Sequence, residues 1–498
     1  MPIHHRILAA IAVTLAAAPA HGQSLAQGQV PSGEGDAPPP GGTGVSSLRD
    51  EGVLCVFDPT ARRKLREARI LAQPATGDTF VAVRYSARPL PLGLLYPARR
   101  SYATSRPWFG SGAPLVFAGR TYEKHGAPVA LPIGEMRPVG TTADVWLFER
   151  KPAAEPDVLY TPSGPGCEFQ PYRTTTAPVR GARASRGVPP RHRVLGYMTD
   201  RTPSGDPRPA RHFSAVQGRQ LEQGLADMVI TPRHRIGRIE SRPFPFGGGS
   251  DTLSHIVLLR LQDPGERAAG GRALLYVHGY RNTFEAAARR AAQLAEDLDF
   301  DGDVYFFSWP SRARISAYGI DVTALERSRR ALAESVGRLL DAYGDGNVSV
   351  IAHSLGTRGF ARAVADLQPA RPGKLFDHVV LASPDQDFVV FRDYDIGPVV
   401  TAANHVTVYS SPADRALFVS RLFVGGRRAG EDPLNVAEIR GIDVIDTSSS
   451  TSGFLGHSDF AESPAALGDL YLLLRGRTPE QRALTRVEND GRGYWTFR

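Results

Sequence analysis

From about residue 193 onward, short apolar segments alternate with longer segments that have helical periodicity. Most of the apolar segments are nearly continuous, which is typical of strands buried on both faces of a sheet. Helical patterns such as "TFEAAARRAAQLAEDL" and "TRGFARAVADL" separate the later ones. This alternation predicts an α/β fold with a mostly parallel, doubly wound sheet. The expected strands are Val194–Met198, Ala226–Ile230, Ala273–His278, Val304–Ser308, Val348–Ala352, His378–Ser383, His405–Ser410 and Ile442–Asp446.

One of these strands leads directly into a serine. In "SVIAHSLGTRGF", residues 349–360, Ser354 lies between the end of a strand and the start of a helical pattern. A reactive serine in such a tight turn needs small residues two positions before and two positions after it. Ala352 and Gly356 occupy these positions, and Ala352 departs from the usual glycine. We interpret Ser354 as a nucleophile; the alternative is a serine that caps the helix N-terminus.

A nucleophilic serine needs a base that takes its proton and an acid that orients the base. His457, in "GFLGHSDF", is the only histidine after the candidate acids, and we predict it to be the base rather than a surface-loop histidine. Asp414 follows the strand before the last and is the predicted acid; the alternative role is the N-cap of "RALFVSRLF". Asp385 and Asp387 follow the preceding strand, and we expect them to cap or brace loops.

A serine nucleophile also needs donors for the negative oxygen of the tetrahedral intermediate. The backbone N–H of Leu355, directly after the nucleophile, is one predicted donor. Tyr280 is the other, because it follows Gly279 at the end of an earlier strand, and glycine allows close approach to a substrate. We expect His278 to be a structural hydrogen-bonding group and Trp309 to pack rather than to line an acyl pocket.

Other classes of site leave no trace in the sequence. It contains no H-E-x-x-H, no paired C-x-x-C, no P-loop and no G-x-G-x-x-G after a strand, so we expect neither a metal nor a cofactor. The formal net charge is +8, but the arginines are scattered and no basic block is interleaved with aromatic residues, so we expect no nucleic-acid partner. The charge favours weak association with an anionic envelope surface; the alternative is an ordinary solvated basic surface.

Residues from about 193 to 475 resemble uncharacterised bacterial α/β-hydrolases of the esterase/lipase superfamily, a group of unknown function. The matching segments are "YMTDRT", "VHGYRNTFEAAARRAAQLAEDL", "FFSWPSRA", "IAHSLGTR", "VVLASPDQD", "VTVYSSPADRAL", "IDVIDTS" and "GHSDF". The resemblance implies the α/β-hydrolase fold and a triad of Ser354, Asp414 and His457. It implies no particular substrate, and it does not reach the residues before 193.

The remaining sequence divides by composition. Residues 1–20 are a predicted signal peptide, and 21–48, rich in Gly, Pro, Ser and Gln, are a predicted disordered linker. Short β-prone runs between turns predict a small all-β module over 50–172. Residues 173–192 form a second predicted linker, and 193–498 the hydrolase domain.

The N-terminus indicates export. Basic residues precede an apolar run over 7–18 and the small-residue site "APA" at 18–20, which is the order of a signal peptide. The run is too short to span a bilayer as a mature helix. We therefore expect a periplasmic or secreted protein, in an oxidising compartment. There Cys55 and Cys167 are hypothesised to form a disulfide; the alternative is two buried free thiols.

These features together predict a serine hydrolase that cleaves carboxylic esters through an acyl-enzyme, with thioesters and amides as further substrate classes. The partner expected is a small-molecule or lipid-like acyl substrate. Two alternatives stay open at this point. The same triad serves acyl transfer to an acceptor other than water, and a hydrolase fold also serves as a non-catalytic envelope-binding scaffold, because fold alone does not establish activity.

Overall fold

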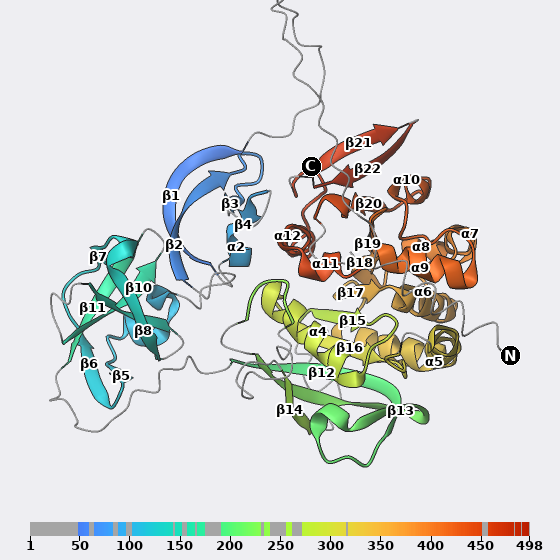
Figure 1. The fold of residues 1–498 in the computed structure, drawn as a ribbon, viewed down its shortest axis with the longest axis horizontal. Helices are drawn as coiled ribbons and strands as arrows, with labels where there is room; N and C mark the ends of the chain where they lie inside the picture. Colours follow the sequence, from blue (N-terminus) through green and yellow to red (C-terminus); the bar gives the residue numbers. More distant parts are fainter. Residues whose placement is uncertain are drawn as a thin grey trace, which may run out of the picture. The chain divides into compact units, whose positions relative to one another are not determined.

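The apolar segments after residue 190 assemble into one eleven-stranded sheet in the computed structural model of the chain (Figure 1). Every segment predicted as a strand contributes to this sheet. Across the sheet the strands are β14 (His255–Arg260), β13 (Phe213–Ile230), β12 (Arg191–Pro203), β16 (Asp303–Ser308), β15 (Ala273–Val277), β17 (Val348–His353), β18 (Phe376–Ala382), β19 (Ala403–Ser410), β20 (Asp443–Asp446), β22 (Arg492–Thr496) and β21 (Thr485–Asn489).

The structure describes most of the chain after residue 47. The predicted signal peptide, all but the last residue of the first predicted linker, and most of the second lie outside the described residues. The described ranges are 48–58, 64–82, 88–95, 102–142, 145–151, 157–164, 167–174, 191–230, 234–239, 255–260, 271–314, 317–450, 457–482, 484–489 and 491–497.

The sheet is mixed rather than uniformly parallel. From β12 through the centre to β22, neighbouring strands run parallel. At one end β12, β13 and β14 pair antiparallel, and at the other end β21 pairs antiparallel with β22. The sequence predicted a mostly parallel sheet without locating antiparallel pairs. They occur at both ends, where β12–β13 and β21–β22 are joined by connections too short for a crossover.

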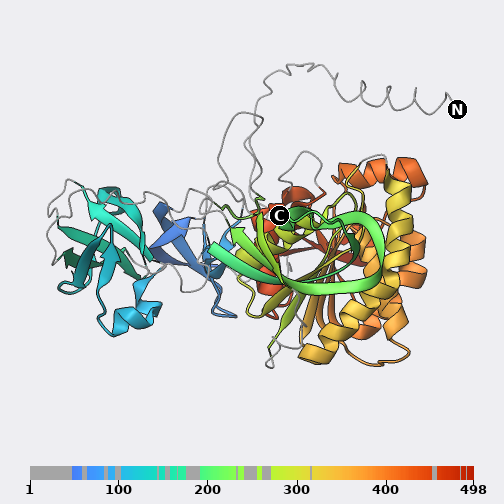
Figure 2. The same cartoon turned by 90° about the horizontal axis from the view of Figure 1, so that it is seen from below.

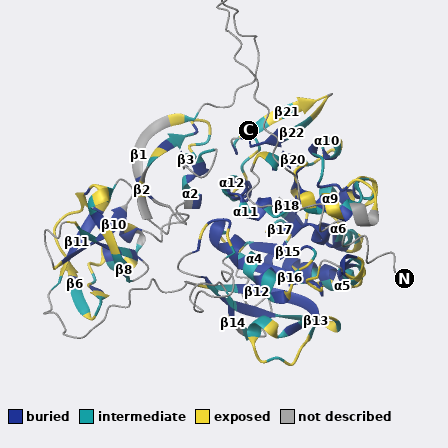
Figure 3. Ribbon diagram, in the orientation of Figure 1, coloured by how far each residue is buried: buried dark blue, intermediate teal, exposed yellow. Residues whose placement is uncertain are grey.

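Helices cover both faces of the sheet, and the strands supply alternate residues to each face. Leu274 and Tyr276 of β15 pack in one core with α4 (Phe284–Asp297), while Leu275 and Val277 pack in the other with α5 (Tyr318–Tyr343). Figure 2 shows α5 and the orange helices along one side of the strands, and Figure 3 shows the buried central strands. The other helices are α11 (Asp459–Glu462) and α12 (Pro464–Leu473) on the α4 face, α6 (Leu355–Leu367), α8 (Ile396–Ala402) and α10 (Pro433–Val436) on the α5 face, and α7 (Phe388–Val390) and α9 (Arg415–Val424).

Two further sheets precede the large one. The four-stranded sheet contains β1 (Arg49–Asp58), β2 (Lys64–Ala72), β3 (Thr79–Val81) and β4 (Leu90–Pro91). The prediction that residues 50–172 form one small all-β module stays a prediction; short helices α2 (Leu92–Leu95) and α3 (Pro107–Gly110) also occur there. The seven-stranded sheet contains β5 (Leu115–Phe117), β6 (Arg120–Lys124), β7 (Val129–Ala130), β8 (Met136–Thr142), β9 (Val145–Arg150), β10 (Val158–Gly164) and β11 (Glu168–Thr174).

A disulfide joins these two sheets, as hypothesised from the sequence. It links Cys55 in β1 to Cys167, the residue before β11, and these are the only cysteines of the chain. The two residues are 112 positions apart, so in the chain-entropy view the bond restricts the unfolded chain by about 4–5 kcal/mol. Among the described helices, none has both the length and the apolar character needed to cross a bilayer.

Candidate active site

Ser354 occupies the turn between β17 and α6, where the sequence predicted a nucleophile. Its φ is 55° and its ψ is −127°, in a region that non-glycine residues rarely adopt. A Cβ on Gly356 would collide with the backbone oxygens of Val277 and His278, so only glycine fits there. Ala352 is fully buried, and the turn accommodates its methyl group. The strained turn therefore requires glycine after the serine but not before it.

His457 lies next to Ser354 although 103 positions separate them in the chain. The Nε2 atom of His457 is 2.8 Å from Ser354 Oγ. The backbone of His457 is held in turn by His353, whose Nε2 donates to the His457 carbonyl oxygen at 2.9 Å. Phe460 contacts the His353 ring, with centroids 4.8 Å apart. The turn that carries Ser354 therefore also holds the backbone of His457 in place.

Asp414 completes the chain of hydrogen bonds. Its Oδ2 is 2.7 Å from His457 Nδ1, and its side chain is buried. Its Oδ1 accepts from the backbone N–H groups of Ala416 and Leu417, at 3.0 and 3.1 Å, at the start of α9. Asp414 thus makes the contacts that both of its predicted roles require: one carboxylate oxygen faces the imidazole and the other caps a helix.

The electrostatics of this group favour a histidine that can hold a proton. Burial would lower the pKa of His457, but the charge of Asp414 and its hydrogen bond outweigh burial and raise that pKa above its ordinary value. Burial lowers the pKa of the neighbouring His353 well below its usual range, so His353 stays neutral. With the Nδ1 proton directed at Asp414, Nε2 of His457 is left to accept the proton of Ser354.

The other two candidate carboxylates are engaged elsewhere, as expected. Asp385 is buried and accepts from Arg428 Nε at 2.9 Å, from Ser420 Oγ at 2.7 Å and from the Tyr318 hydroxyl at 3.0 Å. Asp387 caps α7 by accepting from the backbone N–H groups of Val389 and Val390. Neither carboxylate has a hydrogen bond to His457.

The loop predicted to supply an oxyanion donor runs against the serine. A Cβ on Gly279 would lie 2.6 Å from the Cβ of Ser354, so the backbone passes as close as it can. The Gly279 carbonyl oxygen accepts from His278 Nδ1 at 2.7 Å and from Asn282 Nδ2 at 3.1 Å. The Gly279 carbonyl and the Tyr280 N–H belong to one planar peptide group and point in opposite directions. The two hydrogen bonds to the carbonyl oxygen therefore also fix the direction of the Tyr280 N–H. Leu355 opens α6, where its N–H has no intrahelical partner. The oxyanion roles of Leu355 and Tyr280 stay predictions.

His278 and Trp309 form a buried structural pair, in keeping with the expectation for both. Their rings stack with centroids 5.0 Å apart, and Trp309 Nε1 donates to the His278 carbonyl oxygen at 2.8 Å. Burial lowers the pKa of His278 to about 3, so it does not act as a base at neutral pH. The Tyr280 hydroxyl donates to the Arg314 carbonyl oxygen.

Sequence reasoning missed Arg201, a buried residue that holds the loop carrying Gly279 and Tyr280. Its side chain is 1% exposed, and its Nη2 donates to the Asn282 carbonyl oxygen at 2.9 Å while its Nε donates to Ser308 Oγ at 2.9 Å. Burial lowers the pKa of Arg201 to about 10. Its only sequence signal was its place in "YMTDRT", directly after a predicted strand. Across the described ranges, no three His, Cys, Asp or Glu side chains are grouped to hold a metal ion.

Comparison with known proteins agrees with the resemblance seen in the sequence. Residues 261–477 match the family model described as alpha/beta hydrolase of unknown function (DUF900). This confirms the predicted α/β-hydrolase resemblance. No curated protein matches the sequence.

Several solved esterases are similar to part of the chain. An esterase from Pyrobaculum calidifontis is 13% identical, with a TM-score of 0.27 over 44% of this chain and 79% of the esterase. A carboxylesterase cloned from a metagenomic library is 13% identical, with a TM-score of 0.28 over 57% of this chain and 88% of its own. Carboxylesterase CesB from Bacillus subtilis is 12% identical, with a TM-score of 0.26 over 51% and 89%.

Proposed function

We propose that this α/β hydrolase is a serine esterase that cleaves carboxylic esters through an acyl-enzyme. The observation that carries the proposal is the unbroken chain of hydrogen bonds from Ser354 Oγ through the His457 ring to Asp414 Oδ2, at 2.8 and 2.7 Å. A hydroxyl on a strained turn, a base within hydrogen-bond reach and a buried acid behind it are the parts that acyl transfer needs.

In the first half of the reaction, Ser354 Oγ attacks the carbonyl carbon of the ester while its proton moves to His457 Nε2. The carbonyl oxygen becomes negative and is received by the backbone N–H groups of Leu355 and Tyr280. Asp414 stabilises the positive imidazolium without taking its proton. The intermediate then collapses, His457 gives the proton to the leaving alkoxide, and the alcohol departs.

The second half regenerates the serine. Water attacks the acyl-enzyme carbonyl carbon and gives one proton to His457 Nε2. When the new intermediate collapses, the proton returns to Ser354 Oγ and a carboxylic acid is released.

The test is hydrolysis of short- and long-chain nitrophenyl esters together with labelling by a fluorophosphonate probe. We expect the wild-type chain to be labelled once and to hydrolyse at least one ester, and Ser354→Ala to lose both properties with unchanged thermal stability. Ser383→Ala is a matched control, because Ser383 also lies in a turn after a strand, with φ 47°, and has no hydrogen bond to His457. Labelling that persists in Ser354→Ala would refute the proposed nucleophile. A protein that is neither labelled nor active would favour the non-catalytic scaffold.

We also propose that the protein works outside the cytoplasm. The signal-like sequence of residues 1–20 supports this, and so does the Cys55–Cys167 disulfide, because disulfides persist in oxidising compartments. Expression with and without residues 1–20, followed by cell fractionation, tests it. Cytoplasmic retention of the full chain would contradict the proposal.

A further inference from the structure

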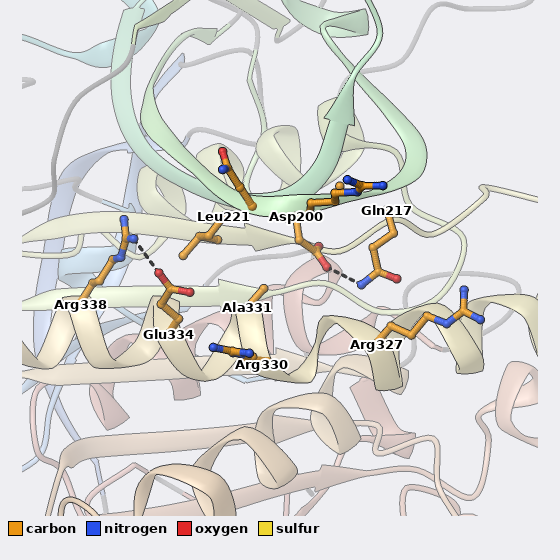
Figure 4. Close-up of a pocket in the computed structure, with 11 residues that line it drawn as sticks. Asp200, Gln217, Leu221, Arg327, Arg330, Ala331, Glu334 and Arg338 are labelled. Atoms are coloured by element: carbon orange, nitrogen blue, oxygen red, sulfur yellow. Dashed lines mark hydrogen bonds and ion pairs between the residues drawn. The ribbon is translucent and has the colours of Figure 1, made fainter.

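A groove of about 550 Å³ lies between β13 and the outer face of α5 (Figure 4). It shares no residue with the Ser354 site. One wall comes from residues 217–221 of β13 and the other from α5, with Leu221 and Ala331 between the two. Small-molecule sites commonly have volumes of about 300–1,000 Å³, so the groove is large enough for a ligand.

Arginines line this groove on both sides. On α5 the lining residues Arg327, Arg330, Glu334 and Arg338 recur at intervals of three and four, which puts them on one face of the helix. At 1.5 Å per residue, Arg327 and Arg338 are about 16 Å apart along the helix axis. Arg219 adds a further guanidinium from β13. Because Glu334 lies in this row and pairs with Arg338, the uncompensated positive charge on α5 is that of Arg327 and Arg330.

Most of these arginines have no counter-ion within the part of the chain that the structure describes. Arg338 is paired: it donates to Glu334 at 2.6 Å and to Gln223 at 2.7 Å. Arg219, Arg327 and Arg330, by contrast, have neither a hydrogen bond nor an ion pair to any described residue. Like charges held side by side repel one another, and a bound anion would relieve that repulsion.

The inner end of the groove holds a buried polar group that is only half satisfied. Asp200 is 3% exposed and points from β12 toward the groove, and its Oδ2 accepts from Gln217 Nε2 at 3.0 Å. Its Oδ1 has no hydrogen-bond partner among the described residues, since the nearby Ser328 hydroxyl donates to the Ala324 carbonyl instead. Burial raises the pKa of Asp200.

We propose that this groove binds a soluble small molecule that carries at least two phosphate groups. Arginine's planar fork matches phosphate oxygens in a bidentate geometry. Arg219 on one side of the groove and Arg327 and Arg330 on the other suit a ligand with more than one phosphate group. The unpartnered Oδ1 of Asp200 at the inner end can accept from a hydroxyl group of the ligand, and Leu221 and Ala331 provide an apolar floor for the part between the charges. Because the arginines line a recess rather than a flat surface, the groove suits a ligand that enters it better than a membrane.

Calorimetric titration of the full chain with inorganic tripolyphosphate tests the proposal. We expect saturable binding that weakens at least tenfold in Arg327→Gln/Arg330→Gln. The control Arg238→Gln/Arg440→Gln removes two exposed arginines elsewhere and should bind as the wild type does. Arg327→Lys/Arg330→Lys keeps the charge but loses the fork, so its affinity should lie between the two.

Three outcomes would overturn the proposal. Equal weakening in the control variant would mean that only net charge matters. Equally tight binding of citrate would remove the preference for phosphate. Binding to phosphatidylglycerol vesicles without any binding of tripolyphosphate would assign the arginines to a lipid surface. None of these measurements uses an ester, so the result is independent of the proposed esterase activity.

Discussion

The Ser354 site and the arginine groove lie on the same sheet and differ in how their polar groups are satisfied. At the Ser354 site each key side chain has a protein partner: Ser354 has His457, and His457 has Asp414. Among the described residues, the buried Arg201 donates to the Ser308 hydroxyl and to the backbone carbonyl oxygens of Ser214, Asn282 and Ser311. In the groove, three arginines have no partner among the described residues.

The contrast separates two kinds of functional surface. A site that performs chemistry must hold its own groups in place before the substrate arrives, because reorganisation would add to the barrier. A site that only binds can leave its charges unpaired, because the ligand completes them. Substitutions should therefore reduce activity at the first site and ligand affinity alone at the second.

The largest effect is expected for Asp414→Asn. The amide oxygen can still cap α9, but Nδ1 of His457 loses its acceptor, so kcat should fall by about 10⁴-fold while the melting temperature changes little. Steady-state kinetics with a nitrophenyl ester and thermal unfolding check this. Asp387→Asn alters a cap that does not touch His457 and should keep its activity. A variant that unfolds without losing specific activity would reduce Asp414 to a cap.

Arg201→Met should have the next largest effect. It leaves the Ser308 hydroxyl and the Asn282 carbonyl without their buried donor, and each unsatisfied group costs about 1–3 kcal/mol. The oxyanion loop should loosen as well, so kcat should fall more than KM rises. Urea unfolding and kinetics together measure both effects. Arg327→Met is the control on the groove side, expected within about 0.5 kcal/mol of the wild type; similar losses in both variants would erase the contrast.

A smaller effect concerns pH. The raised pKa of His457 means that kcat/KM should increase with pH through a value above 6.5, because only the neutral imidazole accepts the proton of Ser354. In Asp414→Asn the inflection should move to lower pH. Stability should vary in the opposite sense: the protonated pair contributes fully below pH 6.5 and its contribution is lost as pH rises through the folded pKa. His457→Gln should therefore lose more stability at pH 5 than at pH 9, and equal losses would argue against the Asp414 pairing.

The smallest effect on stability is expected for the groove variant in which ligand affinity should change most. Arg327→Gln/Arg330→Gln should leave the free energy of unfolding within about 0.5 kcal/mol of the wild type, since neither side chain is buried or paired. Urea denaturation in the presence and absence of tripolyphosphate measures it. The ligand should stabilise the wild type and not the variant. A large loss of stability without ligand would show that these arginines brace the fold.

Much of the Ser354 site could be read from the sequence because its signals are local. Ser354 stands out because an apolar strand precedes it, a helical pattern follows it and small residues lie two positions away on either side. His457 stands out because it is the only histidine after the candidate acids. The sheet centre was predictable for the same reason: strands such as β15 and β17 are apolar throughout.

The rest depends on packing that no local pattern records. The first half of β13 is mostly polar and only partly buried, so alternation of apolar segments does not reveal it, and the antiparallel ends of the sheet went unpredicted. Arg201 looks like any other arginine until the fold buries it. The groove exists only because β13 lies beside α5. The spacing of the arginines on α5 indicates a binding site only once the neighbouring strand is known.

Asp414 divides its two oxygens between the imidazole and the first turn of α9. Reactivity is thereby tied to the integrity of one short segment: if that turn frays, the carboxylate is released and the imidazole loses its orientation. We therefore expect the proposed hydrolytic activity to be lost on heating at a lower temperature than that at which the whole protein unfolds. A ligand or substitution that ordered or disordered residues 414–417 would therefore change the rate of the proposed reaction without contacting Ser354.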